Sequence, residues 1–157
     1  DKNIVIAGGG DSALDWTIFL ADVAKEVTLV HRRKAFRGAL DSVEKVENLA
    51  NSGKIKLITD AEITSIGGHE HLEKLTVTES NETVTEIDCD YFIPLFGLSP
   101  KLGPIKEWGL DLGKESILVD TKDYQTSVPG IFAVGDINHY EGKLKLILCG
   151  FSEAAIA

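Results

Sequence analysis

The chain has 157 residues, 43% of them hydrophobic, and a formal net charge of −9, which suits a soluble globular protein with one ordinary domain or one small domain plus part of another. The negative charge argues against a nucleic-acid or anionic-membrane surface, since such surfaces need clustered positive charge. The two cysteines, Cys89 and Cys149, lack C-x-x-C and metal-ligand spacing. We therefore expect buried thiols in a reducing cytoplasm, with no zinc site and no redox dithiol.

The two ends of the sequence predict that it is part of a longer protein. It contains no Met, opens directly on an apolar strand pattern, and stops inside a helical pattern at 153–157. No apolar stretch has the length of a membrane span, so we expect no membrane association.

The first sixty residues alternate between strand and helix patterns. The predicted elements are a strand over 4–7, a helix over 11–25, a strand over 27–30, a helix over 38–51 and a strand over 55–58. In the first helix, the spacing places Ala13, Trp16, Thr17 and Leu20 on one apolar face. Continuous apolar strands separated by amphipathic helices predict a Rossmann-type parallel sheet in an α/β fold.

After Asp60 the pattern changes to short-range alternation. Three short strands are predicted around 63–66, 72–77 and 84–89, and they form an antiparallel three-stranded β-meander. A further apolar strand over 91–96 is followed by Gly, Ser and Pro residues at 97–100, which predicts a domain boundary near Gly97.

The last sixty residues have a different character. Glycines and prolines divide them into short segments, and the predicted strands are 117–119 and a buried strand over 131–134. This segment has too little apolar material for an independent core. We expect it to complete a domain whose other half is missing.

The junction of the first strand and the first helix carries a dinucleotide-binding pattern. Gly8, Gly10 and Ala13 fill the form G-x-G-x-x-A, in which the absence of side chains lets a pyrophosphate approach the free N–H groups of the helix. Ser12 can add a hydroxyl donor, whereas Asp11 is better explained as a helix N-cap. The candidate residues are Gly8, Gly9, Gly10, Asp11, Ser12 and Ala13. The alternative is a turn in which the glycines only permit a sharp bend.

A basic cluster follows the second predicted strand. An NAD-preferring protein would carry an acidic residue there for the ribose hydroxyl, but this chain has His31, Arg32, Arg33 and, a few residues on, Arg37. Guanidinium groups bind a 2'-phosphate through paired hydrogen bonds, so the cluster predicts NADPH rather than NADH. For His31, a sugar contact or a packing contact is as plausible as a charged role, and the alternative for the arginines is a solvated basic turn.

A third pattern, residues 126–136, ends in Gly135-Asp136. It resembles the second FAD fingerprint of the two-dinucleotide-domain flavoprotein reductases, the thioredoxin-reductase-like group and its relatives. The resemblance implies that Asp136 accepts a hydrogen bond from the flavin ribitol chain and that Gly135 allows close passage of the backbone. The alternative is an Asp that caps a loop after a core strand.

The resemblance covers essentially the whole chain. Residues 102–110 and 136–155 are similar to the thioredoxin-reductase-like ferredoxin–NADP+ reductases of bacteria, and the chain has no C-x-x-C. The resemblance implies an NADP(H)-binding domain over 1–97 and the C-terminal part of an FAD-binding Rossmann-like domain over 98–157. The N-terminal part of that FAD domain, with its first FAD motif, is expected before residue 1, so this piece is not expected to be active alone.

The implied activity is hydride transfer between NADPH and FAD, with ferredoxin as electron partner, in a cytoplasmic enzyme that is a homodimer at full length. The cofactors supply the chemistry, so we expect no acid–base catalytic residue and no metal. Two alternatives remain open: a thioredoxin or disulfide reductase whose C-x-x-C lies outside this chain, and a non-catalytic NADPH-binding module.

Overall fold

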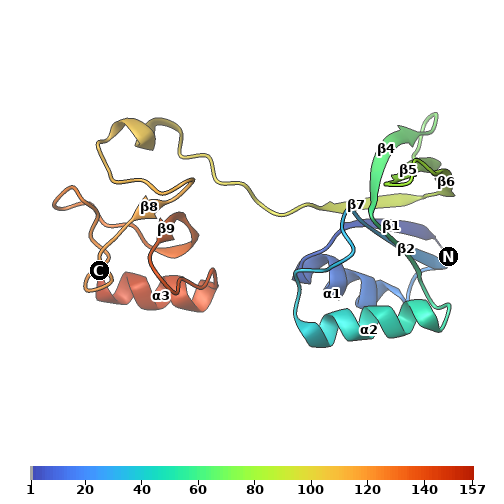
Figure 1. Ribbon diagram of the computed structural model, residues 1–157, viewed down its shortest axis with the longest axis horizontal. Coiled ribbons are helices and arrows are strands. Elements are labelled where there is room, and N and C mark those ends of the chain that lie inside the picture. The colour runs from blue at the N-terminus through green and yellow to red at the C-terminus, as the bar shows by residue number, and fades with distance from the viewer. Residues whose placement is uncertain (1) are drawn as a thin grey trace. The chain divides into compact units, whose positions relative to one another are not determined.

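The computed structural model describes residues 2–157, and the chain divides between Gly97 and Leu98 into two compact units. Figure 1 labels the elements of both units. In the first unit they are β1 (Asn3–Gly8), α1 (Asp11–Leu20), β2 (Glu26–His31), α2 (Leu40–Asn51), β3 (Lys56–Thr59), β4 (Ala61–Gly67), β5 (Lys74–Glu79), β6 (Val84–Asp88) and β7 (Tyr91–Leu95).

Two sheets organise the first unit. Four parallel strands lie in the order β3-β2-β1-β7, and a separate antiparallel sheet has the order β4-β5-β6. The predicted Rossmann-type sheet and the predicted meander are both confirmed. Strand β7 lies at an edge of the parallel sheet, which explains how Pro94, with no N–H to donate, is accommodated in a strand.

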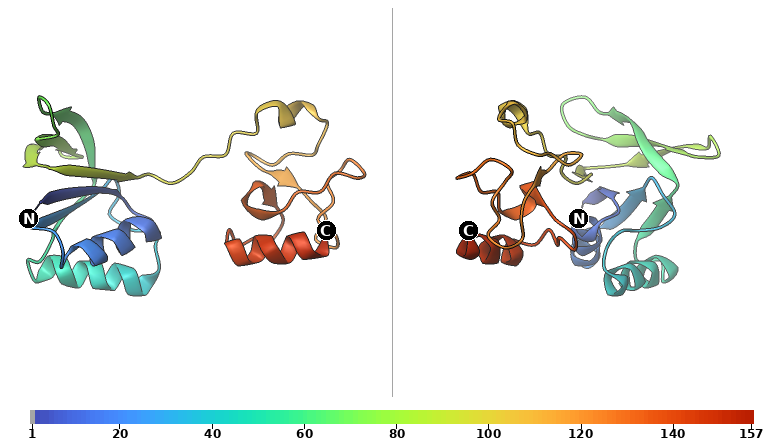
Figure 2. Two further views of the ribbon diagram at one scale, coloured as in Figure 1. Left: turned by 180° about the vertical axis from the view of Figure 1, so that it is seen from behind. Right: turned by 60° about the vertical axis from the view of Figure 1, so that its left-hand side comes forward.

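The parallel sheet is covered on both faces. Helices α1 and α2 lie on one face and the three-stranded sheet on the other, as Figures 1 and 2 show from opposite sides. Successive residues of β1 serve the two faces, because side chains alternate along a strand. Ile6 packs with Leu14 and Val46 of the helices, whereas Val5 packs with Leu75 of β5. This double burial is why the strands of the sequence are continuously apolar.

Helix α1 differs from its prediction in length and in its buried face. It ends at Leu20 rather than at Lys25, and its buried residues are Ala13, Leu14 and Thr17. Trp16 was expected on that face but is 47% exposed, in an edge-to-face pair with Phe19 at 5.8 Å between ring centroids. Each residue turns the helix by about 100°, which carries Trp16 from the stripe that faces the sheet onto the flank of the helix.

The second unit has little regular structure. Its elements are a 3-10 helix η1 (Gly103–Glu107), β8 (Ile117–Leu118), a 3-10 helix η2 (Gly135–Ile137), β9 (Asn138–His139) and α3 (Ile147–Ile156), with β8 and β9 forming a parallel pair. The buried apolar cluster of this unit consists of Leu102, Leu110, Ile117 and Ala133. Among the described helices of both units, none has the length and apolarity that crossing a bilayer requires.

The prediction of a buried strand over 131–134 was wrong. Phe132 forms only one isolated bridge, with Gln125, and is 44% exposed. Ile131 and Ala133 pack against the apolar cluster, so the segment is extended and buried along one side. A Pro-Gly turn before it and the positive-φ Gly135 after it leave no length for a ladder of hydrogen bonds.

The two cysteines are free, and only one fits the expected environment. Cys89 is 2% exposed in the cluster beside Val5, as predicted. Cys149 lies in the first turn of α3 and is half-buried, so the expectation of a buried thiol was wrong there. The α3 surface around it is apolar and open, with Leu148 77% and Phe151 74% exposed.

A test of the two-faced core is the substitution Leu75→Ala. Leu75 is fully buried between β5 and the parallel sheet, so we expect the free energy of unfolding of the first unit to fall by about 2–5 kcal/mol in urea titrations. The control Val84→Ala, at a residue 63% exposed on β6, should change it by less than about 0.5 kcal/mol. Similar losses for both would contradict this packing.

Candidate cofactor-binding site

The turn between β1 and α1 depends on missing side chains. A Cβ placed on Gly8 would lie 2.6 Å from the Leu95 carbonyl oxygen and 2.9 Å from the Cβ of Ala13. Glycine at this position therefore lets α1 pack closely against the ends of β1 and β7, and the buried, small Ala13 is the other side of that contact.

His31 lies directly against the turn. A Cβ on Gly9 would be 2.1 Å from the His31 ring, which is 6% exposed and stacks on Phe36 at 5.1 Å between centroids. Its Nε2 lies 3.2 Å from the Ala35 carbonyl oxygen, which can only accept, so Nε2 donates. Burial lowers the pKa of His31, and Arg32, Arg33 and Arg37 lower this pKa further. His31 is thus seen in packing contacts with Gly9 and Phe36, and its contact with a cofactor stays a prediction.

Gly10 differs from its two neighbours because space around it is open. A Cβ placed there would meet no atom within 4 Å. Gly10 is the N-cap of α1 and has no side chain to cap this end, so the N–H groups of Asp11 and Ser12 have no intrahelical partner, whereas that of Ala13 donates to the Gly10 carbonyl oxygen at 3.0 Å. Ser12 is exposed in the same first turn. Open space in front of unpaired N–H groups is the arrangement that binds phosphate oxygens.

Asp11 does not have the role predicted for it. It was expected to cap α1, but its Oδ1 accepts a hydrogen bond of 2.7 Å from the backbone N–H of Ala39, the N-cap residue of α2. Gly10 is the N-cap of α1 and Asp11 is already its first helical residue, which leaves the Asp11 carboxylate to accept from the neighbouring helix. Its carboxylate holds the start of α2 beside the start of α1.

The loop from β2 to α2 is fixed to the glycine turn through its backbone. The Arg37 N–H donates to the Gly9 carbonyl oxygen at 2.7 Å. A Cβ placed on Gly38 would lie 2.4 Å from the Leu14 side chain, so only glycine lets the loop pass this close to α1. Together with the bond from Ala39 to Asp11, these contacts hold the loop beside the open end of α1.

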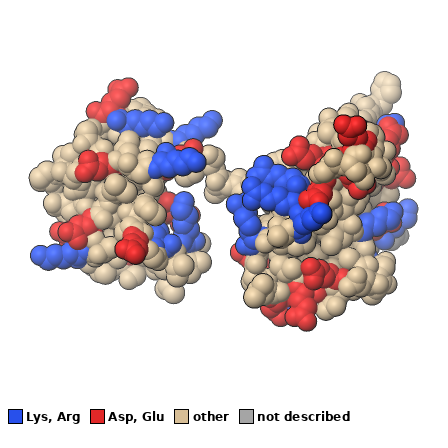
Figure 3. Space-filling model, in the orientation of Figure 1, with Lys and Arg blue, Asp and Glu red and all other residues tan. Residues whose placement is uncertain are grey.

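The loop carries all three arginines of the chain, Arg32, Arg33 and Arg37, and each of them is exposed. In Figure 3 a group of basic side chains lies over this loop. No arginine takes part in an ion pair within residues 2–157, whereas Lys34 of the same loop pairs with Asp60 at 3.5 Å. Guanidinium groups without a carboxylate partner, next to an open helix N-terminus, have the chemistry to bind an anion.

The second candidate site lies in the other unit, at Gly135 and Asp136. Gly135 has φ +79°, a left-handed conformation that favours glycine, and a Cβ there would meet no atom within 4 Å. Asp136 follows in η2 and is exposed. A Cβ placed on Gly150 of α3 would lie 3.2 Å from the Gly135 Cα, so the helix packs directly on this turn.

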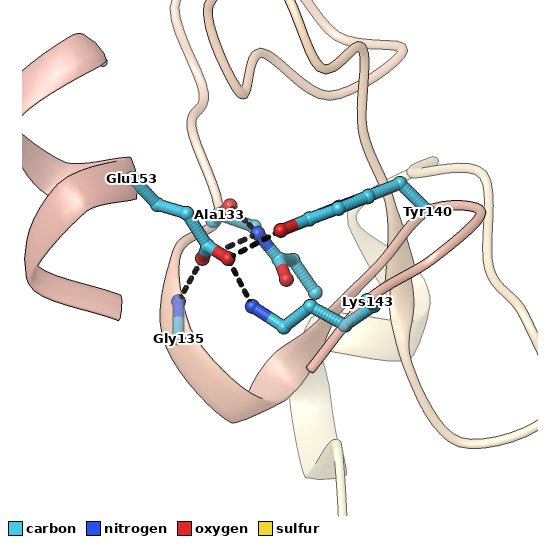
Figure 4. A network of polar contacts seen from close by, with 6 residues as sticks. Ala133, Gly135, Tyr140, Lys143 and Glu153 are labelled. Atoms are coloured by element: carbon cyan, nitrogen blue, oxygen red, sulfur yellow. Dashed lines mark hydrogen bonds and ion pairs between the residues drawn. The ribbon is translucent and has the colours of Figure 1, made fainter. Parts of the chain in front are cut away.

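A buried polar cluster around Glu153 supports this turn, as Figure 4 shows. The carboxylate is 1% exposed and accepts from the Gly135 N–H at 2.7 Å, the Asn138 amide at 3.0 Å, the Tyr140 hydroxyl at 2.9 Å and the Lys143 ammonium group. Burial raises the pKa of Glu153, but the hydrogen bonds from Lys143, Gly135 and Tyr140 outweigh it and bring the pKa to about 2. The same contact with Glu153 raises the pKa of Tyr140.

The sequence prediction missed Glu153 and its partners. One signal was available, because Glu153 is the only charged residue in the apolar helix from Ile147 to Ile156. A buried charge requires partners, but Asn138, Tyr140 and Lys143 are spaced without a pattern and could not be chosen in advance. Gly38 was also missed, since its crowding by Leu14 depends on the path of a loop.

A comparison with protein families gives one match over nearly the whole chain. The model of the pyridine nucleotide-disulphide oxidoreductases matches residues 1–154. The chain belongs to this family. The family match agrees with the resemblance that the sequence shows to the flavoprotein reductases.

Two curated relatives of high identity are both named as ferredoxin–NADP reductases. The Ferredoxin–NADP reductase of Flavobacterium johnsoniae is 66% identical over 157 residues, which cover 99% of this chain and 45% of the relative. Ferredoxin–NADP reductase 1 of Christiangramia forsetii is 65% identical over 159 residues, covering 99% of this chain and 45% of the relative. The chain spans about half the length of the curated relatives it matches.

Solved structures confirm the fold. A Lactococcus lactis thioredoxin reductase superimposes with a TM-score of 0.81 at 26% identity, over 100% of this chain and 50% of that one. Thioredoxin reductase of T. acidophilum gives a TM-score of 0.83 at 24% identity over 99% of this chain and 50% of that one, a likeness of fold alone.

The glycine turn can be tested with a matched pair of substitutions. Gly9→Ala drives a Cβ into the His31 ring, so we expect a loss of about 1–3 kcal/mol in the free energy of unfolding of the first unit. Gly10→Ala enters open space and should cost less than about 1 kcal/mol. Urea titration measures both, and the reverse order would rule out this geometry of the turn.

The Glu153 cluster predicts a pH dependence of stability. The pKa of Glu153 is about 2 in the folded chain against an ordinary 4.5, so its stabilisation is complete above pH 4.5 and disappears as the pH falls toward 2. Glu153→Gln should lower the stability of the second unit by about 3–5 kcal/mol at pH 7, because it leaves Lys143 buried without its partner. It should also flatten the acid limb between pH 4.5 and 2.

Trp108 fluorescence during urea unfolding reports on the second unit in a Trp16→Phe background, since the chain has only these two tryptophans. An unchanged acid limb in Glu153→Gln would show that another carboxylate controls it.

Proposed function

We propose that this chain is the NADP(H)-binding portion, with part of the FAD-binding domain, of a flavin-dependent oxidoreductase that transfers hydride between NADPH and FAD and exchanges electrons with ferredoxin. The observation that carries the proposal is the arginine loop: backbone hydrogen bonds hold its chain beside the open N-terminus of α1, and its three exposed guanidinium groups have no carboxylate partner within residues 2–157. When bound, the nicotinamide and flavin supply the hydride chemistry.

The residues of the first unit fit a nucleotide with two kinds of phosphate. The N–H groups behind Gly10 would hold the pyrophosphate, because the space there is open and the end of α1 is uncapped. Arg32 and Arg33 would bind the 2'-phosphate, since their side chains are exposed and free of carboxylate partners in residues 2–157. Gly9 and His31 support the turn from behind.

The residues of the second unit fit a flavin contact. Gly135 leaves its front open in a left-handed conformation, and the exposed Asp136 carboxylate can accept a hydrogen bond from a ribitol hydroxyl. In the proposal, residues 1–97 bind NADP(H) and residues 98–157 contribute to the FAD domain. Because the curated relatives are about twice as long as this chain, the complete activity belongs to a longer protein.

Ferredoxin as the electron partner is supported by the names of the curated relatives. Those that are 66% and 65% identical are both called ferredoxin–NADP reductases, whereas the Lactococcus lactis thioredoxin reductase is 26% identical over the aligned residues. Reduction of a ferredoxin by the full-length protein with NADPH distinguishes this partner from a disulfide substrate and from a non-catalytic NADPH-binding role.

Two finer parts of the proposal concern the whole protein. We place it in the cytoplasm, which suits free thiols at Cys89 and Cys149, and we expect a homodimer at full length. Light scattering of the full-length protein measures the second of these, and a mass of one subunit would exclude the dimer.

The cofactor assignment is tested by removing Arg32 and Arg33 together. The double alanine variant should bind NADP+ about 10–100-fold more weakly, because it loses the charge-assisted hydrogen bonds to the 2'-phosphate, whereas affinity for NAD+ should change less than threefold. Calorimetric titration measures both affinities. The matched control is Lys34→Ala, which removes a positive charge of the same loop that is already paired with Asp60 and should change NADP+ affinity less than threefold. Equal losses for NADP+ and NAD+ would refute the 2'-phosphate assignment.

A further inference from the structure

The two oxygens of the buried Glu153 carboxylate hold different parts of the chain. Oε2 accepts from the Gly135 N–H at 2.7 Å and from the Asn138 side-chain amide at 3.0 Å. Oε1 accepts from the Tyr140 hydroxyl at 2.9 Å and from the ammonium group of Lys143. Figure 4 shows these contacts converging on the end of the Glu153 side chain. One oxygen thus serves the Gly135 turn and the other serves the segment that follows it.

The Oε2 contacts fix the Gly135-Asp136 turn from both sides. Before the turn, the Ala133 carbonyl oxygen accepts from the Asn138 amide at 2.9 Å, and the same amide donates to Oε2. At the turn itself, the Gly135 N–H donates to Oε2 directly. Gly135 has no side chain to hold it in its left-handed conformation, so its course depends on these hydrogen bonds and on the contact with Gly150 of α3.

The ion pair by itself does not explain why this position holds a carboxylate. The side chains of Glu153 and Lys143 are 1% and 3% exposed, and at such burial an apolar pair of similar volume is often as stabilising as two charges. An apolar pair, however, gives the Gly135 N–H no acceptor. The carboxylate is therefore distinguished by what it does for the turn.

We propose that Glu153 is a positioning residue for the flavin: its Oε2 holds the Gly135 N–H and the Asn138 amide, and thereby keeps Asp136 in the conformation that binds FAD. Lys143 and Tyr140 act on the other oxygen and keep the buried carboxylate in place. This inference rests on the proposed function, because it requires that the Gly135-Asp136 turn contacts FAD.

The test compares two double variants of the full-length protein, both of which remove the ion pair. In Glu153→Gln with Lys143→Met, the amide oxygen can take the place of Oε2 and accept from Gly135 and Asn138, while the amide N–H group faces the Tyr140 hydroxyl, which can accept. In Glu153→Met with Lys143→Met, the volume is similar but no acceptor remains. The measurements are the FAD dissociation constant, the visible circular dichroism of the bound flavin and the thermal midpoint of the apoprotein.

We expect the glutamine variant to bind FAD within threefold of the unaltered protein and to keep its flavin dichroism. The methionine variant should bind FAD at least tenfold more weakly at a comparable thermal midpoint. Equal FAD affinities in the two variants would overturn the proposal, since a merely structural role of Glu153 predicts that affinity follows stability. If the unaltered full-length protein bound no FAD, the proposed function would fail instead, so the two failures are distinguishable.

A second comparison covers the case in which the methionine variant does not fold. Asn138→Leu removes a donor on the Oε2 side, and Tyr140→Phe removes a donor on the Oε1 side. We expect FAD affinity to fall at least fivefold in Asn138→Leu and less than twofold in Tyr140→Phe. Equal losses in these two variants would likewise overturn the proposal.

Discussion

The fold of the first unit depends on how closely neighbouring residues approach the backbone at Gly8 and Gly9. The Leu95 carbonyl oxygen, the Ala13 methyl group and the His31 ring all occupy space that a side chain at these positions would need. Because that space is filled by protein atoms, the first two glycines serve packing between the sheet, α1 and the β2 end. Only Gly10 has open space where a side chain would stand, and under the proposed function that space holds the phosphate.

Much of this arrangement was predictable because its causes are local. Continuous apolar strands, helical spacing and the glycine turn each depend on residues that are close together in the sequence. Such patterns predicted the parallel sheet, the meander and the basic loop. The role of Asp11 was not predictable in the same way. Its partner, the Ala39 N–H, is twenty-eight residues away along the chain, and the approach depends on the path of a loop that passes Gly38.

The second unit shows the same limit more strongly. Gly135-Asp136 could be found from a continuous string, but the Glu153 cluster that supports it gathers residues from four separate positions between Asn138 and Glu153. The buried strand expected over 131–134 failed because apolar content was taken to mean a ladder of hydrogen bonds, whereas only Ile131 and Ala133 face the apolar cluster. Burial and strand pairing are separate properties, and apolar content predicts only the first.

In the loop between β2 and α2, the groups that hold the backbone differ from the side chains that, under the proposed function, select the cofactor. The course of the loop is held by the backbone N–H groups of Arg37 and Ala39, by the missing side chain of Gly38 and by the bond from His31 Nε2 to the Ala35 carbonyl oxygen. The Arg32 and Arg33 side chains form no ion pair within residues 2–157. Substitutions at residues 32 and 33 should therefore leave the backbone course of the loop unchanged. Under the proposed function, a change of charge at these two positions alone can shift the preference from one nicotinamide cofactor to the other. Few substitutions are then needed, whether they arise in evolution or by engineering.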